Sequence, residues 1–95
     1  MRTAFHPSAR VQFLRSGEYA EWSLDEYLAK LPGAPADDEP LRTRRLLTLE
    51  TADTSATALL ELDYPAVRFV DHMTLLRIDG EWTIVNKVFE AHPKA

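Results

Sequence analysis

Residues 71–89 read DHMTLLRIDGEWTIVNKVF, and this stretch decides the fold. Two long β-prone runs flank Asp79-Gly80. A two-residue type I′ turn needs positive φ at both central positions, and an Asp-Gly pair supplies it readily. The segment therefore predicts a β-hairpin with strands at about 67–78 and 81–90.

The turn also predicts the register of this hairpin, because a two-residue loop places Ile78 opposite Glu81. On one face, together with Phe69, the predicted pairs are Arg77 with Trp82, Leu75 with Ile84, Met73 with Asn86 and Asp71 with Val88. The other face is predicted to carry Val70, His72, Thr74, Leu76, Thr83, Val85, Lys87 and Phe89. Both faces mix apolar residues with a few polar ones, so each face needs a cover.

Two further strands are expected before this hairpin, at about 41–51 and 55–63. The breaks at 52–54 and 64–66 are short, which is typical of an antiparallel meander. Residues 32–40 are rich in proline and acidic residues and are expected to form a loop.

The first third of the chain predicts a short hairpin followed by a helix. The β-prone runs 11–14 and 19–22 flank Ser16-Gly17. Ser23 and Glu26 form a capping-box pattern. The apolar positions that follow at helical spacing are Leu24, Tyr27, Leu28 and Leu31, and Pro32-Gly33 ends the helix. One helix of about two turns cannot cover a four-stranded sheet, so a cover is missing or comes from a partner.

Composition restricts the function classes. The chain has 95 residues, which indicates a single α+β domain spanning 1–95. A net charge of −4 argues against nucleic-acid or anionic-membrane binding as the main task. The absence of cysteine excludes a disulfide scaffold, and three scattered histidines give no metal motif. No secretion signal or membrane span is visible, so a cytoplasmic location is expected.

Both ends of the chain resemble one known superfamily. FHPSARV at residues 5–11 is similar to the start of the first strand of nuclear transport factor 2-like proteins, and residues 71–89 resemble their final hairpin. Within this superfamily the chain is most similar to the lumazine-binding, polyketide-cyclase-like and ketosteroid-isomerase-like branch. The resemblance implies a cone: a strongly curved antiparallel sheet, barrel-like, around a cavity. Such proteins usually begin with one or two long helices, most of which this chain is expected to lack.

Asp71 is the sharpest candidate for chemistry. Apolar neighbours disfavour a charged carboxylate, which suits a general acid or base. Asn86, diagonal to it on the predicted face, would donate a hydrogen bond to a developing oxyanion. The alternative is structural: the two side chains satisfy each other or backbone groups.

His72 does not form a dyad with Asp71, because adjacent strand residues point to opposite faces. The resemblance implies a homodimer formed sheet to sheet. We expect its interface to bury His72, Thr74, Val85, Lys87 and Phe89.

Three functions remain open. The leading one is a small-molecule-binding domain with an apolar pocket in the cone. The predicted ligand-binding residues are Phe69, Met73, Trp82, Ile84 and, at the rim, His6. The alternatives are a cofactor-independent isomerase, dehydratase or cyclase that uses Asp71, and a non-catalytic dimeric interaction domain. None of the three requires a cofactor.

Overall fold

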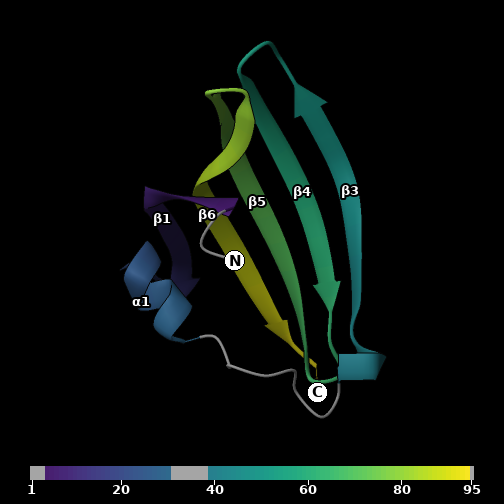
Figure 1. Ribbon diagram of the computed structural model, residues 1–95. Coiled ribbons are helices and arrows are strands. Elements are labelled where there is room, and N and C mark those ends of the chain that lie inside the picture. The colour runs from purple at the N-terminus through teal and green to yellow at the C-terminus, as the bar shows by residue number, and fades with distance from the viewer. Residues whose placement is uncertain (1–3, 31–38, 95) are drawn as a thin grey trace.

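The computed structural model describes residues 4–30 and 39–94. They form one six-stranded sheet with a single short α-helix after the first hairpin, so the predicted sheet-dominated α+β class is confirmed (Figure 1). The elements are β1 (Phe5–Arg15), β2 (Glu18–Ser23), α1 (Leu24–Ala29), η2 (Glu39–Leu41), β3 (Thr43–Thr51), β4 (Ser55–Asp63), β5 (Val67–Ile78) and β6 (Glu81–Pro93).

The sheet is open rather than closed into a barrel. Its strand order is β2-β1-β6-β5-β4-β3, so β2 and β3 are the two edges. The meander from β3 to β6 is antiparallel as expected, but β1 pairs with β6 in parallel. A closed cone is therefore not confirmed, and the sheet is mixed rather than purely antiparallel.

The turn at Asp79-Gly80 has the predicted geometry, and the turn of the first hairpin shares it. Asp79 and Gly80 have φ of 52° and 81°, and Ser16 and Gly17 have φ of 51° and 82°. Positive φ at both central positions is the signature of a type I′ turn. The local signals for both hairpins are thus confirmed.

The predicted register of the last hairpin is correct only near its turn. Leu75 pairs with Ile84 as expected, but Thr74 pairs with Asn86, so Val85 is an extra residue in β6. This β-bulge shifts every later pair by one position. Asp71 consequently lies opposite Phe89 instead of Val88.

A one-residue shift moves side chains to the other face of the sheet. We call the face that carries Asp71 and packs against α1 the inner face, and the opposite one the outer face. Lys87 and Phe89 lie on the inner face, contrary to the prediction that both share a face with His72 and Thr74. Asn86 pairs with Thr74 and lies on the outer face, so it cannot act beside Asp71.

The buried core is concentrated near α1. Phe5, Ala9 and Leu24 form its centre, and Tyr27, Leu28 and Ile84 pack against it. Helix α1 lies against β1 and β2, and its Tyr27 reaches Lys87 of β6. Among the described residues no helix lies against the inner face of β3, β4 or β5.

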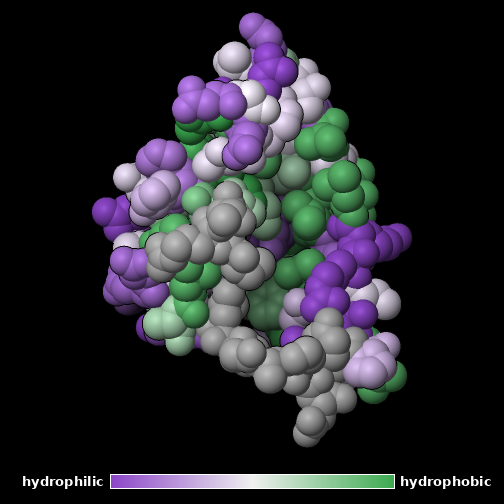
Figure 2. All heavy atoms as spheres, in the orientation of Figure 1, coloured by the Kyte–Doolittle hydropathy of each residue, from purple (hydrophilic) through white to green (hydrophobic). Residues whose placement is uncertain are grey.

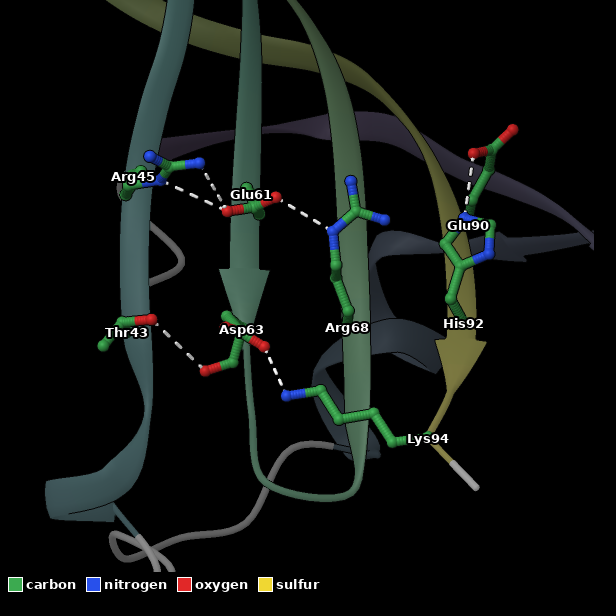
Figure 3. Close-up of polar contacts among 8 residues, drawn as sticks. All are labelled: Thr43, Arg45, Glu61, Asp63, Arg68, Glu90, His92 and Lys94. Carbon is green, nitrogen blue, oxygen red and sulfur yellow. Dashed lines mark hydrogen bonds and ion pairs between the residues drawn. The ribbon is translucent and has the colours of Figure 1, made fainter.

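The outer face of β3–β6 carries a ladder of charged side chains (Figure 3). Glu61 accepts hydrogen bonds from Arg45 and Arg68, each with an N–O distance of 2.9 Å, and Lys94 contacts Asp63 at 2.6 Å. Such exposed pairs contribute little to stability. His72 and Thr74 share this face, and its pairing with a second copy stays a prediction.

Some predictions lie outside the described residues. These are the helical position Leu31, the helix stop at Pro32-Gly33, the loop up to residue 38, and the start of the chain before residue 4. No described helix is long and apolar enough to cross a membrane.

Helix α1 begins with the predicted capping box. The Glu26 backbone N–H donates to Ser23 Oγ at 3.2 Å, and the Ser23 backbone N–H donates to Glu26 Oε1 at 2.9 Å. These bonds satisfy two donors that the first turn would leave unpaired. The cap matters because α1 carries Tyr27 to the inner face.

Replacing Ser23 by alanine should lower the free energy of unfolding by about 1 kcal/mol, since one helix donor loses its acceptor. Urea denaturation followed by circular dichroism measures the change. Ser55→Ala, at an exposed strand start, is the matched control and should be neutral. Equal effects of both substitutions would contradict a stabilising cap.

Candidate ligand-binding pocket

A pocket of about 310 Å³ lies between α1 and the inner face of the sheet. In Figure 2 this side of the molecule is hollowed, and hydrophobic surface forms the floor of the hollow. The pocket is lined by Trp22, Tyr27, Lys30, Arg42, Leu62, Tyr64, Phe69, Asp71, Lys87 and Phe89. It therefore combines residues from β2, α1, β4, β5 and β6 with residues beside them.

Five aromatic rings form a continuous part of the lining. Tyr27 neighbours Trp22 with ring centroids 6.4 Å apart, and Trp22 neighbours Phe89 at 6.1 Å. Phe89 then contacts Phe69 at 6.1 Å, and Phe69 contacts Tyr64 at 5.6 Å. Aromatic faces and edges of this kind favour a flat, partly apolar ligand.

A buried ion pair lies in this aromatic pocket. Lys87 Nζ is 3.0 Å from Asp71 Oδ2, and the side chains are only 8% and 2% exposed. Lys87 Nζ also donates a hydrogen bond of 2.8 Å to the Tyr27 hydroxyl and lies 4.7 Å from the centre of that ring. Tyr27, Lys87 and Asp71 thus form a chain of polar contacts from helix to sheet.

The charge of Lys87 is stabilised by these neighbours. Burial by itself lowers the pKa of Lys87, but the Asp71 carboxylate and the hydrogen bond to Tyr27 outweigh it. The pKa is therefore held above its ordinary value of 10.5. At neutral pH Lys87 is an ammonium group, which suits it to binding an anion or an oxyanion and not to attack as a free amine.

The second oxygen of Asp71 has a different role. Oδ1 is buried and has no hydrogen-bond partner among the described residues. A buried acceptor without a donor costs about 1–3 kcal/mol, more when it is charged. Asp71 is also one of the residues that line the pocket.

The structure brings together only part of the predicted site. Phe69 and Asp71 line the pocket as expected. Ile84 packs in the core near α1, and Trp82 and Met73 do not line the pocket. His6 is engaged locally, since its Nδ1 accepts a hydrogen bond from the Ser8 backbone N–H at 3.0 Å.

Sequence reasoning missed Lys87, Tyr27 and most of the aromatic lining. Lys87 was assigned to the outer face because regular alternation was assumed through β6. Two adjacent apolar pairs, Ile84-Val85 and Val88-Phe89, interrupt the alternation of β6, so neither one by itself locates the bulge, and no glycine marks it. Tyr27 was recognised as part of the apolar side of the helix but not as a hydrogen-bonding group.

A second groove of about 600 Å³ lies where β1 and β6 separate. Its polar side chains are Gln12, Glu90 and His92, none of which is buried. Residues 4–30 and 39–94 contain no group of three side chains able to hold a metal ion. The smaller pocket is therefore the better candidate site.

Lys87→Met should lower the free energy of unfolding by about 3–5 kcal/mol, because it leaves the Asp71 carboxylate buried without its cation. The double variant Asp71→Leu/Lys87→Met removes both charges and should be clearly more stable than the single variant. Urea denaturation of the single and double variants tests this.

Lys94→Met is the control, since it breaks the exposed contact to Asp63 and should change stability by less than about 0.5 kcal/mol. If Lys87→Met were no more destabilising than Lys94→Met, the buried pair would be contradicted.

Similar proteins share this fold. The chain aligns with nuclear transport factor 2-like proteins of unknown function from Shewanella baltica (TM-score 0.89, 23% identity, 99% of this chain and 77% of that one) and Methylobacillus flagellatus (TM-score 0.78, 30% identity, 97% and 74%). The "Aldolase FrzH" of a Cladobotryum species is 22% identical over 93 residues, covering 98% of this chain and 74% of that protein.

The sequence model of the family described as "Putative lumazine-binding" matches residues 1–90, which is nearly the whole chain. The solved relatives confirm the superfamily that both ends of the sequence indicated. The chain belongs to this family, described as "Putative lumazine-binding", within the nuclear transport factor 2-like proteins.

Proposed function

We propose that this domain binds a small planar ring compound that donates an N–H or O–H hydrogen bond to Asp71. The observation that carries the proposal concerns Asp71, a residue of the pocket lining, whose buried Oδ1 lacks a donor among the described residues. A ligand donor at this position would remove the cost of the unsatisfied acceptor.

The size and lining of the pocket support a compact ligand. Its volume of about 310 Å³ is at the lower end of the range for small-molecule sites. Trp22, Phe69 and Phe89 offer ring surfaces against which a flat molecule can pack. Lys87 lies beside Asp71 and can donate a further hydrogen bond to a ligand carbonyl.

The family description suggests a first probe. Lumazine is a planar pteridine dione with ring N–H donors and carbonyl acceptors. That pattern matches an acceptor at Asp71 and a donor at Lys87, with aromatic rings on the walls. Lumazine is therefore a suitable representative of the proposed ligand class.

Titration with lumazine should quench the fluorescence of Trp22. Asp71→Asn should weaken binding about 10- to 100-fold, because a hydrogen bond to a charged group is worth about 1.5–3 kcal/mol. Calorimetric titration gives the affinities, and circular dichroism checks that the variant is folded.

Asp63→Asn is the matched control, because this carboxylate lies on the outer face beside Lys94, and binding should be unchanged. The proposal fails if folded Asp71→Asn binds as tightly as the parent chain. It also fails if neither lumazine nor other planar N–H donors bind the parent chain.

A second candidate function is proton transfer at a carbonyl compound, as in isomerases, cyclases and aldolases. It is favoured by the ammonium group of Lys87 beside the carboxylate of Asp71. Asp71 Oδ1 would accept the proton when a C–H bond next to the carbonyl breaks. The electron pair moves to the carbonyl oxygen, and Lys87 stabilises the resulting enolate.

Exchange of carbonyl α-protons for deuterium tests this candidate. A cyclic β-diketone in heavy water should exchange faster with the protein than in buffer, as followed by proton NMR. Asp71→Asn should lower this excess rate at least about 100-fold, the usual contribution of a general base. Exchange at the buffer rate with the unmodified protein would reject the enzymatic role and leave the binding role intact.

A further inference from the structure

The edge strand β3 is exposed and carries three leucines. It is the last strand of the sheet. One of its edges pairs with β4, and no other described strand pairs with the free edge. Leu46 and Leu49 are each 56% exposed, and Leu47 is 40% exposed. An edge of this kind presents free backbone groups beside apolar side chains and invites pairing with another strand.

The β-bulge in β3 decides which of its side chains share a face. Leu46 pairs with Leu60 of β4, but the next pair is Thr48 with Leu59, so Leu47 is an extra residue. Leu60 pairs with Asp71, which assigns Leu46 to the inner face. Past the bulge the alternation is offset, and Leu49, opposite Ala58, lies on the inner face as well.

The same pairing of β3 with β4 assigns two oppositely charged residues of β3 to the outer face. Arg45 pairs with Glu61 and Glu50 pairs with Thr57, and both partners belong to that face. Arg45 bonds Glu61 across the ladder through Nε and Nη2, and its side chain remains 66% exposed (Figure 3). It can therefore also meet a carboxylate beyond the edge of the sheet.

Two antiparallel copies of β3 can adopt one register that pairs leucine with leucine and arginine with glutamate at the same time. Directly opposite residues must share a face. With Leu46 opposite Leu49 of a second copy, both leucines are on the inner face. The same register sets Arg45 opposite the second copy's Glu50 on the outer face. A shift by one residue, with Leu46 opposite Thr48, would oppose side chains of different faces.

The backbone agrees with this register past the bulge. The Ala52 N–H donates to the Ser55 carbonyl at 2.8 Å, so residue 52 forms a hydrogen-bonded pair with β4. Going back along β3, non-hydrogen-bonded and hydrogen-bonded pairs then alternate. Leu49 and Thr51 consequently direct their N–H and C=O groups away from β4. A further strand added at the free edge of β3 would pair with these groups.

We propose that β3 pairs antiparallel with β3 of a second copy of this chain, about a two-fold axis between Leu47 and Thr48. The two sheets join into one continuous sheet, and Leu46 of each copy contacts Leu49 of the other. Two Arg45–Glu50 ion pairs form across the contact on the outer face. The contact is isologous, so it ends at the dimer. It does not depend on the ligand pocket, which lies on other strands.

Disulfide cross-linking tests the register. The chain has no cysteine of its own, so Leu46→Cys/Leu49→Cys introduces the only thiols. Three residues of strand separate the two positions by about 10 Å, which is too far for a bond within one chain. Mild oxidation should therefore yield mostly covalent dimers on a non-reducing gel.

Leu46→Cys/Thr48→Cys is the matched control for the register shifted by one residue, and it should give at least fivefold less dimer. Glu50→Arg places like charges opposite each other and should shift sedimentation toward the monomer, while Arg45→Glu/Glu50→Arg should restore the dimer. No cross-linking of the first pair, equal cross-linking of the control, or a dimer insensitive to Glu50→Arg would overturn the proposal. The last result would point to the outer face instead.

Discussion

The candidate site depends on one buried contact, the ion pair between Lys87 and Asp71. It joins β6 to β5, and its extension to Tyr27 attaches α1 to the inner face of the sheet. Removing two charges from water is costly unless they are paired and hydrogen-bonded. The pair uses one carboxylate oxygen and leaves the other without a described donor. That asymmetry is the basis of the ligand site that we propose.

The ion pair in turn depends on a bulge of one residue. Val85 is the extra residue of β6, and without it Lys87 would lie on the outer face. A buried charge network is a strong reason for a strand to keep such an irregularity, because a slip in register would separate the partners. The bulge in β3 acts similarly at the sheet edge, where it decides which side chains face the same way.

Local signals made much of the fold predictable. The Asp79-Gly80 and Ser16-Gly17 turns, the Ser23–Glu26 cap and the four strands of the meander follow from propensities over a few residues. The parallel pairing of β1 with β6 and both bulges are tertiary features without a local signature. For this reason Asp71 was found, whereas Asn86 was paired with it wrongly and Lys87 was missed. Fold similarity could not correct this, because a shared fold does not specify a site.

The titration of Lys87 tests the central contact most directly. Carbon NMR of the lysine Cε as a function of pH, assigned by comparison with Lys87→Met, gives the pKa of this side chain. A lysine paired with Asp71 and bonded to Tyr27 should titrate above the ordinary value of 10.5. A value of 10.5 would indicate a solvent-exposed side chain on the outer face, and a lower value would indicate burial without the carboxylate. Either result would contradict the account.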